Sequence, residues 1–179
     1  MTQLDFGILD WVQTHLRCAF LDAVVPAITL LGEFGAVWIL LALVLLMRKE
    51  TRTVGVAVVV ALAVDVLLCN GVLKPLIARP RPFTLRPEIE LLVKAPWDYS
   101  FPSGHTAASF AAVAALFQQK SRLWIPALVL GTAIALSRIY LYVHYPSDVL
   151  CGVILGILCG LIGGFFAGKW NELCKKRKK

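Results

Sequence analysis

Six long apolar segments constrain this chain more than any other feature of its sequence. Hydrophobic residues make up 59% of its 179 residues, compared with roughly 45–50% in a typical soluble domain, and they are gathered in blocks. A helix needs about 20 mostly apolar residues to cross a bilayer. The pattern therefore predicts an all-α fold, a polytopic membrane bundle of six transmembrane helices in a single domain over residues 1–179. The predicted spans cover residues 18–32, 35–47, 54–77, 104–119, 123–143 and 147–168.

Ahead of the first span, residues 4–16 predict a short amphipathic helix. Leu4, Ile8 and Trp11 fall on one side at helical spacing, while Asp5 and Asp10 fall elsewhere. A helix of this kind lies in the membrane interface with its apolar face in the lipid.

Basic residues between the spans predict the orientation of the bundle. Arg48 and Lys49 follow the second span, Lys120 and Arg122 follow the fourth, and residues 169–179 form a Lys-rich tail. All three groups lie on one side of a six-span bundle, and the positive-inside rule makes that side the cytoplasm. We therefore expect a multi-pass protein of the cell membrane with both termini in the cytoplasm.

The same tail explains much of the net charge of +7. A basic tail after an apolar span interacts with anionic membrane lipids. Nucleic acid is not an expected partner, because the aromatic residues lie in apolar stretches and not among the basic ones.

The loop at about residues 78–103 breaks the charge rule. It falls on the opposite side from the tail and yet carries four basic residues, which are Arg79, Arg81, Arg86 and Lys94. Cations kept on this side indicate a task such as holding an anion.

Three polar clusters stand at span ends on that same, extracytoplasmic side. The first runs from Lys74 to Pro82, the second from Pro102 to His105, and the third from Ser137 to Asp148. Together they bring two histidines, three strong cations and one carboxylate to one face of the membrane.

The cations and the helix start in these clusters suit a phosphate group. Lys74, Arg81 and Arg138 concentrate positive charge, and an Arg fork matches phosphate oxygens. Ser103 is a candidate N-cap for the helix that follows, whose free N–H groups form an anion site, and Gly104 lets the backbone approach the ligand.

The histidines add hydrolytic chemistry. His144 and Asp148 are four residues apart, so Asp148 can accept from one ring nitrogen and leave the other free to attack phosphorus. His105 can protonate the departing oxygen and then activate water. The clusters hold too few carboxylates to suggest a metal, and we expect neither a metal nor another cofactor.

The combined pattern resembles the type-2 phosphatidic acid phosphatase superfamily. That resemblance implies a six-helix membrane bundle, a phosphohistidine at His144 and a proton donor at His105. It also implies a phosphate site formed by Lys74, Arg81, Ser103, Gly104 and Arg138. The motifs read Lys74-x6-Arg81-Pro82, Pro102-Ser103-Gly104-His105 and Ser137-Arg138-x5-His144-x3-Asp148.

Two further residues are candidates for supporting roles. Asn70 lies four residues before Lys74 on the same helix face and can position it. Arg79 lies two residues from Arg81, where it either supports the phosphate or is a solvated loop residue. The sequence assigns no role to four other residues near the clusters, Asp65, Arg86, Trp97 and Tyr99.

A site at the membrane edge calls for an amphiphilic substrate, a lipid phosphate whose tail stays in the bilayer. Small bacterial members of the resembled family act on undecaprenyl diphosphate, phosphatidylglycerophosphate or phosphatidate. For this chain we expect undecaprenyl diphosphate, with phosphatidylglycerophosphate or phosphatidate as the alternative. Vanadium haloperoxidases share the motifs but are large and soluble. A non-catalytic membrane protein is the remaining alternative, and it would be expected to lose a catalytic His or Asp. The sequence does not predict an oligomeric state.

Overall fold

The computed structural model describes residues 2–176, with side chains described for residues 3–174. Over this range the chain is helical and contains no strand. The elements are α1 (Thr2–His15), α2 (Ala19–Leu31), η1 (Glu33–Gly35), α3 (Ala36–Met47), α4 (Arg52–Asp65), η2 (Val66–Leu73), α5 (Lys74–Ile77), α6 (Pro82–Leu85), α7 (Gly104–Gln118), α8 (Trp124–Tyr140) and α9 (Pro146–Lys176).

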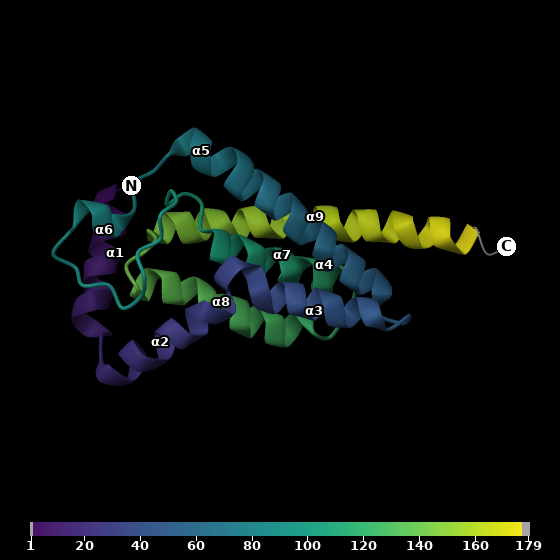
Figure 1. Ribbon diagram of the computed structural model, residues 1–179, viewed down its shortest axis with the longest axis horizontal. Coiled ribbons are helices and arrows are strands. Elements are labelled where there is room, and N and C mark those ends of the chain that lie inside the picture. The colour runs from purple at the N-terminus through teal and green to yellow at the C-terminus, as the bar shows by residue number, and fades with distance from the viewer. Residues whose placement is uncertain (1, 177–179) are drawn as a thin grey trace.

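The long helices form an elongated bundle with two distinct ends (Figure 1). One end carries α1, which lies across the bundle, together with α6 and the loop that follows it; we call this the site end. The opposite end carries the α3–α4 and α7–α8 connections, and the last turns of α9 extend beyond it.

Helix α7 lies at the centre of the bundle and packs against α9, α8 and α4. Its inner face is lined by small residues, with Ala107, Ala111 and Ala115 fully buried. On α9, a Cβ added at Gly156 would come within 2.9 Å of the backbone nitrogen of Ala111. Glycines at four-residue spacing on α9 therefore let two helix backbones approach closely.

The apolar lengths place the chain in a membrane. Arg52–Leu85 and Pro146–Cys174 are each long and apolar enough to cross a bilayer, and the bent pair Ala19–Leu31 and Glu33–Met47 gives a third such stretch if counted as one span. Large apolar side chains also remain exposed along α9, among them Phe165 and Phe166, as expected for a surface that faces lipid.

The prediction that residues 18–32 and 35–47 form two spans is wrong. The two segments meet at a bend of only 43°, whereas two successive spans must reverse direction. Phe34 and Gly35 both have left-handed backbone conformations, with φ of 49° and 69°, and they bend the chain without turning it back. Helices α2 and α3 therefore cross the membrane at most once between them.

This correction moves the N-terminus. The described ends of the chain, Thr2 and Lys176, lie at opposite ends of the bundle (Figure 1). The prediction that both termini lie on one side is therefore wrong, because it depended on an even number of crossings.

The last helix is longer than predicted. It continues from the expected end at residue 168 to Lys176, so much of the predicted tail at 169–179 is helical. No proline interrupts this stretch, and the Lys169 ammonium lies 4.6 Å from the centroid of the Phe165 ring, one turn earlier. The side chains of residues 175–179, which carry most of the tail's charge, lie outside the described residues.

Candidate active site

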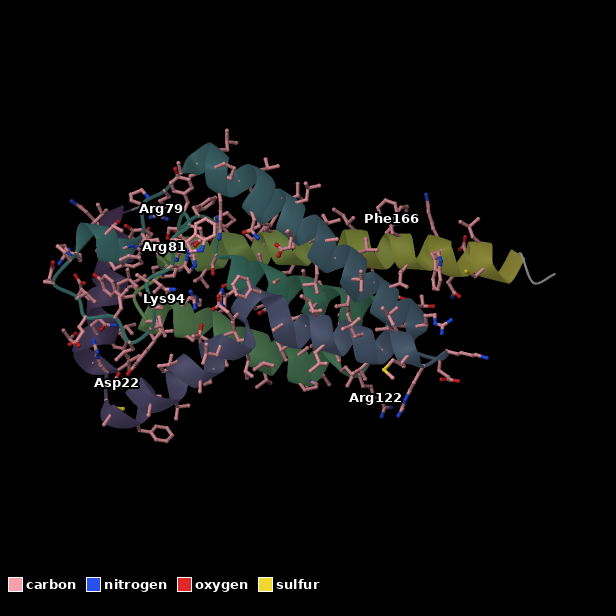
Figure 2. The ribbon with its side chains drawn as sticks, viewed as in Figure 1. Asp22, Arg79, Arg81, Lys94, Arg122 and Phe166 are labelled. Carbon is pink, nitrogen blue, oxygen red and sulfur yellow. The ribbon has the colours of Figure 1, made fainter. Side chains whose placement is uncertain are left out.

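The three predicted clusters meet at the site end of the bundle. Lys74 begins α5, directly after the π-helical stretch η2, and His105 is the second residue of α7. Arg138 lies in the last turn of α8, and His144 and Asp148 flank the start of α9. Figure 2 shows Arg79 and Arg81 at this end and Arg122 at the other.

His144 is buried, with 1% of its surface exposed, and its two ring nitrogens have different surroundings. Nε2 lies 3.2 Å from Nη1 of Arg81, and Nδ1 lies 3.5 Å from Oδ2 of Asp148. The second separation is longer than a normal hydrogen bond, and Nδ1 has no hydrogen-bond partner. The two groups therefore lie close together, but the predicted hydrogen bond between them is not formed in this structure.

The Asp148 carboxylate is fully buried and held from several directions. Oδ1 accepts from Nη1 of Arg79 at 2.5 Å. Oδ2 accepts from Oγ of Ser100 at 2.5 Å and from the backbone N–H of Tyr145 at 3.0 Å. Arg79 thus binds the Asp148 oxygen that is not the one near His144, and 19% of its side chain is exposed.

Two of the predicted phosphate ligands, Lys74 and Arg81, share the carboxylate of Asp98. Nζ of Lys74 pairs with Oδ2, and Nη2 of Arg81 donates to Oδ1 at 2.6 Å. Arg81 also donates through Nε to the Asp98 carbonyl and through Nη1 to the Val143 carbonyl, at 2.8 and 2.7 Å. The guanidinium is therefore fixed between Asp98 and His144.

Arg138 and His105 complete the ring of polar groups. Arg138 is 4% exposed, donates through Nη1 to Oγ1 of Thr29 at 2.5 Å, and has no partner for its Nε. Nε2 of His105 lies 3.5 Å from Oε2 of Glu33, beyond hydrogen-bond distance, and is likewise unpartnered. These two buried, unsatisfied donor groups are suited to an incoming anion.

The start of α7 has no side-chain cap. Ser103 is the N-cap residue, but its hydroxyl makes no capping hydrogen bond and instead accepts from Oγ1 of Thr106 at 3.0 Å. A Cβ on Gly104 would lie 3.7 Å from Nζ of Lys74 and 3.6 Å from Oδ1 of Asn70, so both side chains lie against this glycine. The start of α7 and the Lys74 ammonium therefore lie close together.

Charge and burial keep the site groups in defined states. Burial, together with the charges of Arg81, Arg138 and Lys74, lowers the pKa of His144 well below its usual value, so the imidazole is neutral at pH 7. Burial would raise the pKa of Asp98, but Lys74 and Arg81 lower it to about 2. The site therefore combines a neutral nitrogen base with an ionised carboxylate among three cations.

Sequence reasoning missed several residues of the site. Asp98, Ser100, Asp5, Thr29 and Glu33 each contact a predicted site residue. Their partners lie far away in the sequence, from 17 residues for Asp98 to 109 for Thr29. The sequence offers one local indication of a site role, for Asp98 and Ser100, because both lie shortly before the motif that begins at Pro102.

The four residues without a predicted role lie around the site and not within it. Arg86 lies 3.6 Å from carboxylates of Asp10 and Glu88. Trp97 is 95% exposed, and Tyr99 is about half exposed. Asp65 is buried deeper in α4, and its Oδ1 has no hydrogen-bond partner.

The geometry joins a nucleophilic nitrogen to an anion site. Nε2 of His144 lies beside the guanidinium of Arg81 in a region that also contains buried Lys74 and Arg138, and phosphoryl transfer needs a nucleophile and cations in one place. Over residues 2–176, no group of three or more His, Cys, Asp or Glu side chains is placed to hold a metal ion.

The fold is that of an all-helical membrane protein, with two histidines and three buried basic side chains, Lys74, Arg81 and Arg138, at one end of its bundle. The family model of the PAP2 superfamily matches residues 52–170, which contain all three motifs. The chain belongs to the PAP2 superfamily.

Individual relatives agree with this assignment. The chain is 36% identical over 129 residues to an undecaprenyl-diphosphatase of Sulfolobus acidocaldarius, a match that covers 70% of this chain and 62% of that protein. It is 42% identical over 130 residues to a decaprenylphosphoryl-5-phosphoribose phosphatase of Mycobacterium tuberculosis, covering 70% of this chain and 68% of the relative. The crystal structure of a PAP2-type phosphatidylglycerolphosphate phosphatase from Bacillus subtilis superimposes with a TM-score of 0.75 at 28% identity, covering 94% of this chain and 86% of that one.

Proposed function

We propose that this chain is an integral-membrane lipid phosphatase that hydrolyses a lipid-linked phosphate or diphosphate through a phosphohistidine on His144. One observation carries the proposal. The neutral Nε2 of His144 lies 3.2 Å from the guanidinium of Arg81, inside a ring of buried cations. A nucleophile and the charge that would stabilise its transition state therefore occupy the same place.

In the first step, Nε2 of His144 attacks phosphorus and a P–N bond forms while the P–O bond to the lipid breaks. Asp148 lies 3.5 Å from Nδ1 and stabilises the imidazolium that develops. Lys74, Arg81 and Arg138 stabilise the charge on the equatorial oxygens. Ser103 and Gly104 supply the backbone edge of the phosphate site, and Asn70 helps to place Lys74.

His105 acts as the general acid and then as the general base. It donates a proton to the departing oxygen, and in the second step it accepts one from the water that attacks phosphorus, which breaks the P–N bond and releases phosphate. The Oε2 atom of Glu33 lies 3.5 Å from the Nε2 atom of His105. No metal ion takes part in this scheme.

For the substrate, we favour undecaprenyl diphosphate, which would yield undecaprenyl phosphate and phosphate. The name of the Sulfolobus relative supports a polyprenyl diphosphate. The alternative is a phosphomonoester such as phosphatidylglycerophosphate or phosphatidate, which the name of the Bacillus neighbour supports. The Mycobacterium relative adds a third class, a phosphoribose phosphate on a prenyl carrier.

The orientation follows from charge. The basic connections at Arg48–Lys49 and Lys120–Arg122 lie at the end opposite the site, together with the end of α9, and the positive-inside rule makes that end cytoplasmic. The site then faces the extracytoplasmic side of the cell membrane, where it would meet an exported carrier lipid.

A panel of purified lipid phosphates tests the proposal. Wild type should release phosphate in the presence of chelator, and kcat/KM should be highest for undecaprenyl diphosphate among that lipid, phosphatidylglycerophosphate and phosphatidate. His144→Ala should abolish release and should also abolish an acid-labile, base-stable 32P label on the protein. Loss of wild-type activity in chelator would refute the metal-free scheme, and a label that survives in His144→Ala would refute the assignment of the nucleophile.

A further inference from the structure

We propose that Asp5 and Arg79 are positioning residues of the His144–Asp148 pair, which makes the N-terminal helix α1 part of the support of the active site. The proposal rests on the proposed function of His144 as the nucleophile. It extends that function to a helix outside the three sequence motifs and outside residues 52–170, where the family model matches.

Arg79 is fixed against the first turn of α9. Its Nη1 donates to Oδ1 of Asp148 at 2.5 Å and to Oγ of Ser147 at 2.8 Å. Its guanidinium also lies over the ring of Tyr145, 3.8 Å from the centroid. The side chain therefore has one defined position, and in that position it holds one oxygen of Asp148.

Asp5 holds the other side of Arg79. Its Oδ2 accepts from Nη2 of Arg79 at 2.8 Å and from Oγ of Ser147 at 2.8 Å, while Oδ1 accepts from the backbone N–H of Ser147 at 3.0 Å. Only 4% of Asp5 is exposed. A buried carboxylate from α1 thus binds both the start of α9 and the arginine that holds Asp148.

Helix α1 is seated firmly enough to keep Asp5 in place. Leu9 is fully buried in a cluster with Tyr142 and Tyr145, and the ring of Phe6 meets that of Tyr145 edge-on at 5.4 Å. Nε2 of Gln13 donates to the carbonyl of Tyr140 at 2.7 Å. The helix therefore packs directly on the segment that presents His144.

The chain of contacts decides which oxygen faces His144. Arg79 occupies Oδ1 of Asp148, which leaves Oδ2 for Nδ1 of His144 at 3.5 Å. Without the Asp5 charge, Arg79 is free to move, and without Arg79 the two buried carboxylates of Asp5 and Asp148 repel each other. Ser100 and the backbone N–H of Tyr145 still hold Oδ2, but Oδ1 then lacks its partner. The carboxylate can therefore tilt relative to the imidazole, which weakens its support of the imidazolium.

A role limited to folding would predict a different outcome. An ion pair that only stabilises the protein would lower its unfolding temperature and leave kcat unchanged in the folded fraction. A positioning role lowers kcat and leaves KM nearly unchanged, because the proposed phosphate site includes neither Asp5 nor Arg79.

The matched control is on the same helix. Asp10 accepts from the hydroxyl of Tyr142 at 2.7 Å and makes no contact with Arg79 or Asp148. Asp5→Asn and Asp10→Asn are therefore the same chemical change on one helix, and only the first touches the chain of contacts to His144. Arg79→Lys provides the conservative change at the second position.

We expect Asp5→Asn to lower kcat about 10–100-fold, the usual cost of losing a group that orients a catalytic ligand, with KM changed less than about twofold. Arg79→Lys should lower kcat in the same way, while Asp10→Asn should remain within about twofold of wild type. Thermal unfolding in detergent identifies the fraction of each variant that is folded.

A second readout needs no substrate. The chain has three histidines, so 15N-labelled imidazole resonances can be assigned by substitution. Asp5→Asn should shift the Nδ1 resonance of His144, and Asp10→Asn should not. Equal kcat values for Asp5→Asn and Asp10→Asn, or an unchanged Nδ1 resonance in Asp5→Asn, would overturn the proposal. If wild type hydrolyses no lipid phosphate, the proposed function fails by itself, and the resonance comparison still decides this proposal.

Discussion

At the scale of single residues, the burial of His144 determines when the nucleophile is available. Burial and three nearby cations lower its pKa well below the usual value of 6.5, so the neutral form persists as the pH falls through 6.5. We predict that the Nε2 resonance of His144 in 15N-labelled, substrate-free protein does not titrate between pH 8 and pH 6.

The direction of the pH dependence follows from the direction of the pKa shift of His144. A folded-state pKa below the unfolded value means that protonation is opposed by the native structure, so the charged form builds up only at lower pH. His144→Ala identifies the resonance by its disappearance. A titration midpoint at or above pH 6.5 would contradict the placement of His144 among buried cations.

Asp98 occupies the cations that the mechanism assigns to phosphate. Its carboxylate bridges Lys74 and Arg81, and its pKa of about 2 keeps it ionised at any assay pH. A bound phosphate therefore has to compete with, or displace, an internal anion. We predict that Asp98→Asn binds inorganic phosphate and vanadate about tenfold more tightly, equivalent to about 1.4 kcal/mol, as measured by their inhibition constants.

The control for this change is Glu90→Gln, an exposed position in the same loop, which should leave both inhibition constants unchanged. Weaker phosphate binding in Asp98→Asn would show instead that the carboxylate serves to orient Lys74 and Arg81, and that the phosphate binds beside it.

The residues that the sequence identified are those whose spacing has a local meaning. His144 and Asp148 are one helical turn apart, and Ser103 and Gly104 stand at a helix start, so their neighbours could be inferred. The contacts of Asp5 and Asp98 are set by how helices and loops fold back on one another. No spacing in the chain encodes these contacts. For the same reason the sequence alone does not decide whether Arg79 supports the phosphate or is a solvated loop residue.

At the scale of helices, glycine on α9 controls the separation from α7. A Cβ at Gly156 would lie 2.9 Å from the Ala111 backbone nitrogen, and a backbone cannot yield as a flexible side chain does. At Gly168, on the same helix, a Cβ would meet nothing within 4 Å. A Gly→Ala change at position 156 therefore alters both the packing and the helix propensity, whereas the same change at position 168 alters the helix propensity alone.

We predict that Gly156→Ala destabilises the protein by about 1–3 kcal/mol, the usual range for overpacking. Gly168→Ala should be neutral or stabilising by up to about 1 kcal/mol, because alanine is the better helix former. Thermal unfolding in one detergent measures both. A Gly156→Ala variant as stable as Gly168→Ala would mean that α7 and α9 are not in close contact.

Helix boundaries were predicted well where the apolar pattern ends in charge or proline, as at α7 and α8. They were predicted poorly where the break is conformational. The left-handed residues Phe34 and Gly35 bend the chain by 43° within a continuous apolar stretch, and the π-helical turn at Val66–Leu73 leaves the hydropathy of its segment unchanged. Hydropathy indicates which residues face lipid, but it does not indicate where the backbone bends.

At the scale of the whole molecule, the two ends of the bundle differ in charge and in function. The site end gathers α1, the loop at residues 78–103 and the histidines, whereas the opposite end carries the basic connections (Figure 1). Since Asp5 contacts Arg79 and Ser147, α1 has to share a side of the membrane with the active site. The charge pattern alone predicts α1 on the other side. That prediction requires the chain to reverse direction between residues 18–32 and 35–47, where it only bends.

This arrangement makes a topological prediction that labelling can test. In an active variant with all five native cysteines replaced by alanine, single cysteines are introduced as Gly7→Cys, Lys94→Cys and Arg122→Cys. All three positions are exposed, and position 7 has open space around a Cβ. Lys94 and Arg122 lie at opposite ends of the bundle (Figure 2).

A membrane-impermeant maleimide applied to intact cells should label positions 7 and 94 and should reach position 122 only after the membrane is permeabilised. If positions 7 and 122 were labelled together, both would lie on one side of the membrane. That result would support an even number of crossings in the whole chain and contradict the contact between Asp5 and Arg79. Labelling of 122 alone in intact cells would keep the fold but invert it, because positions 7 and 94 would still share a side. The agreement between 7 and 94 thus tests the structure, and the side on which they agree tests the positive-inside argument that turns the active site towards an exported lipid.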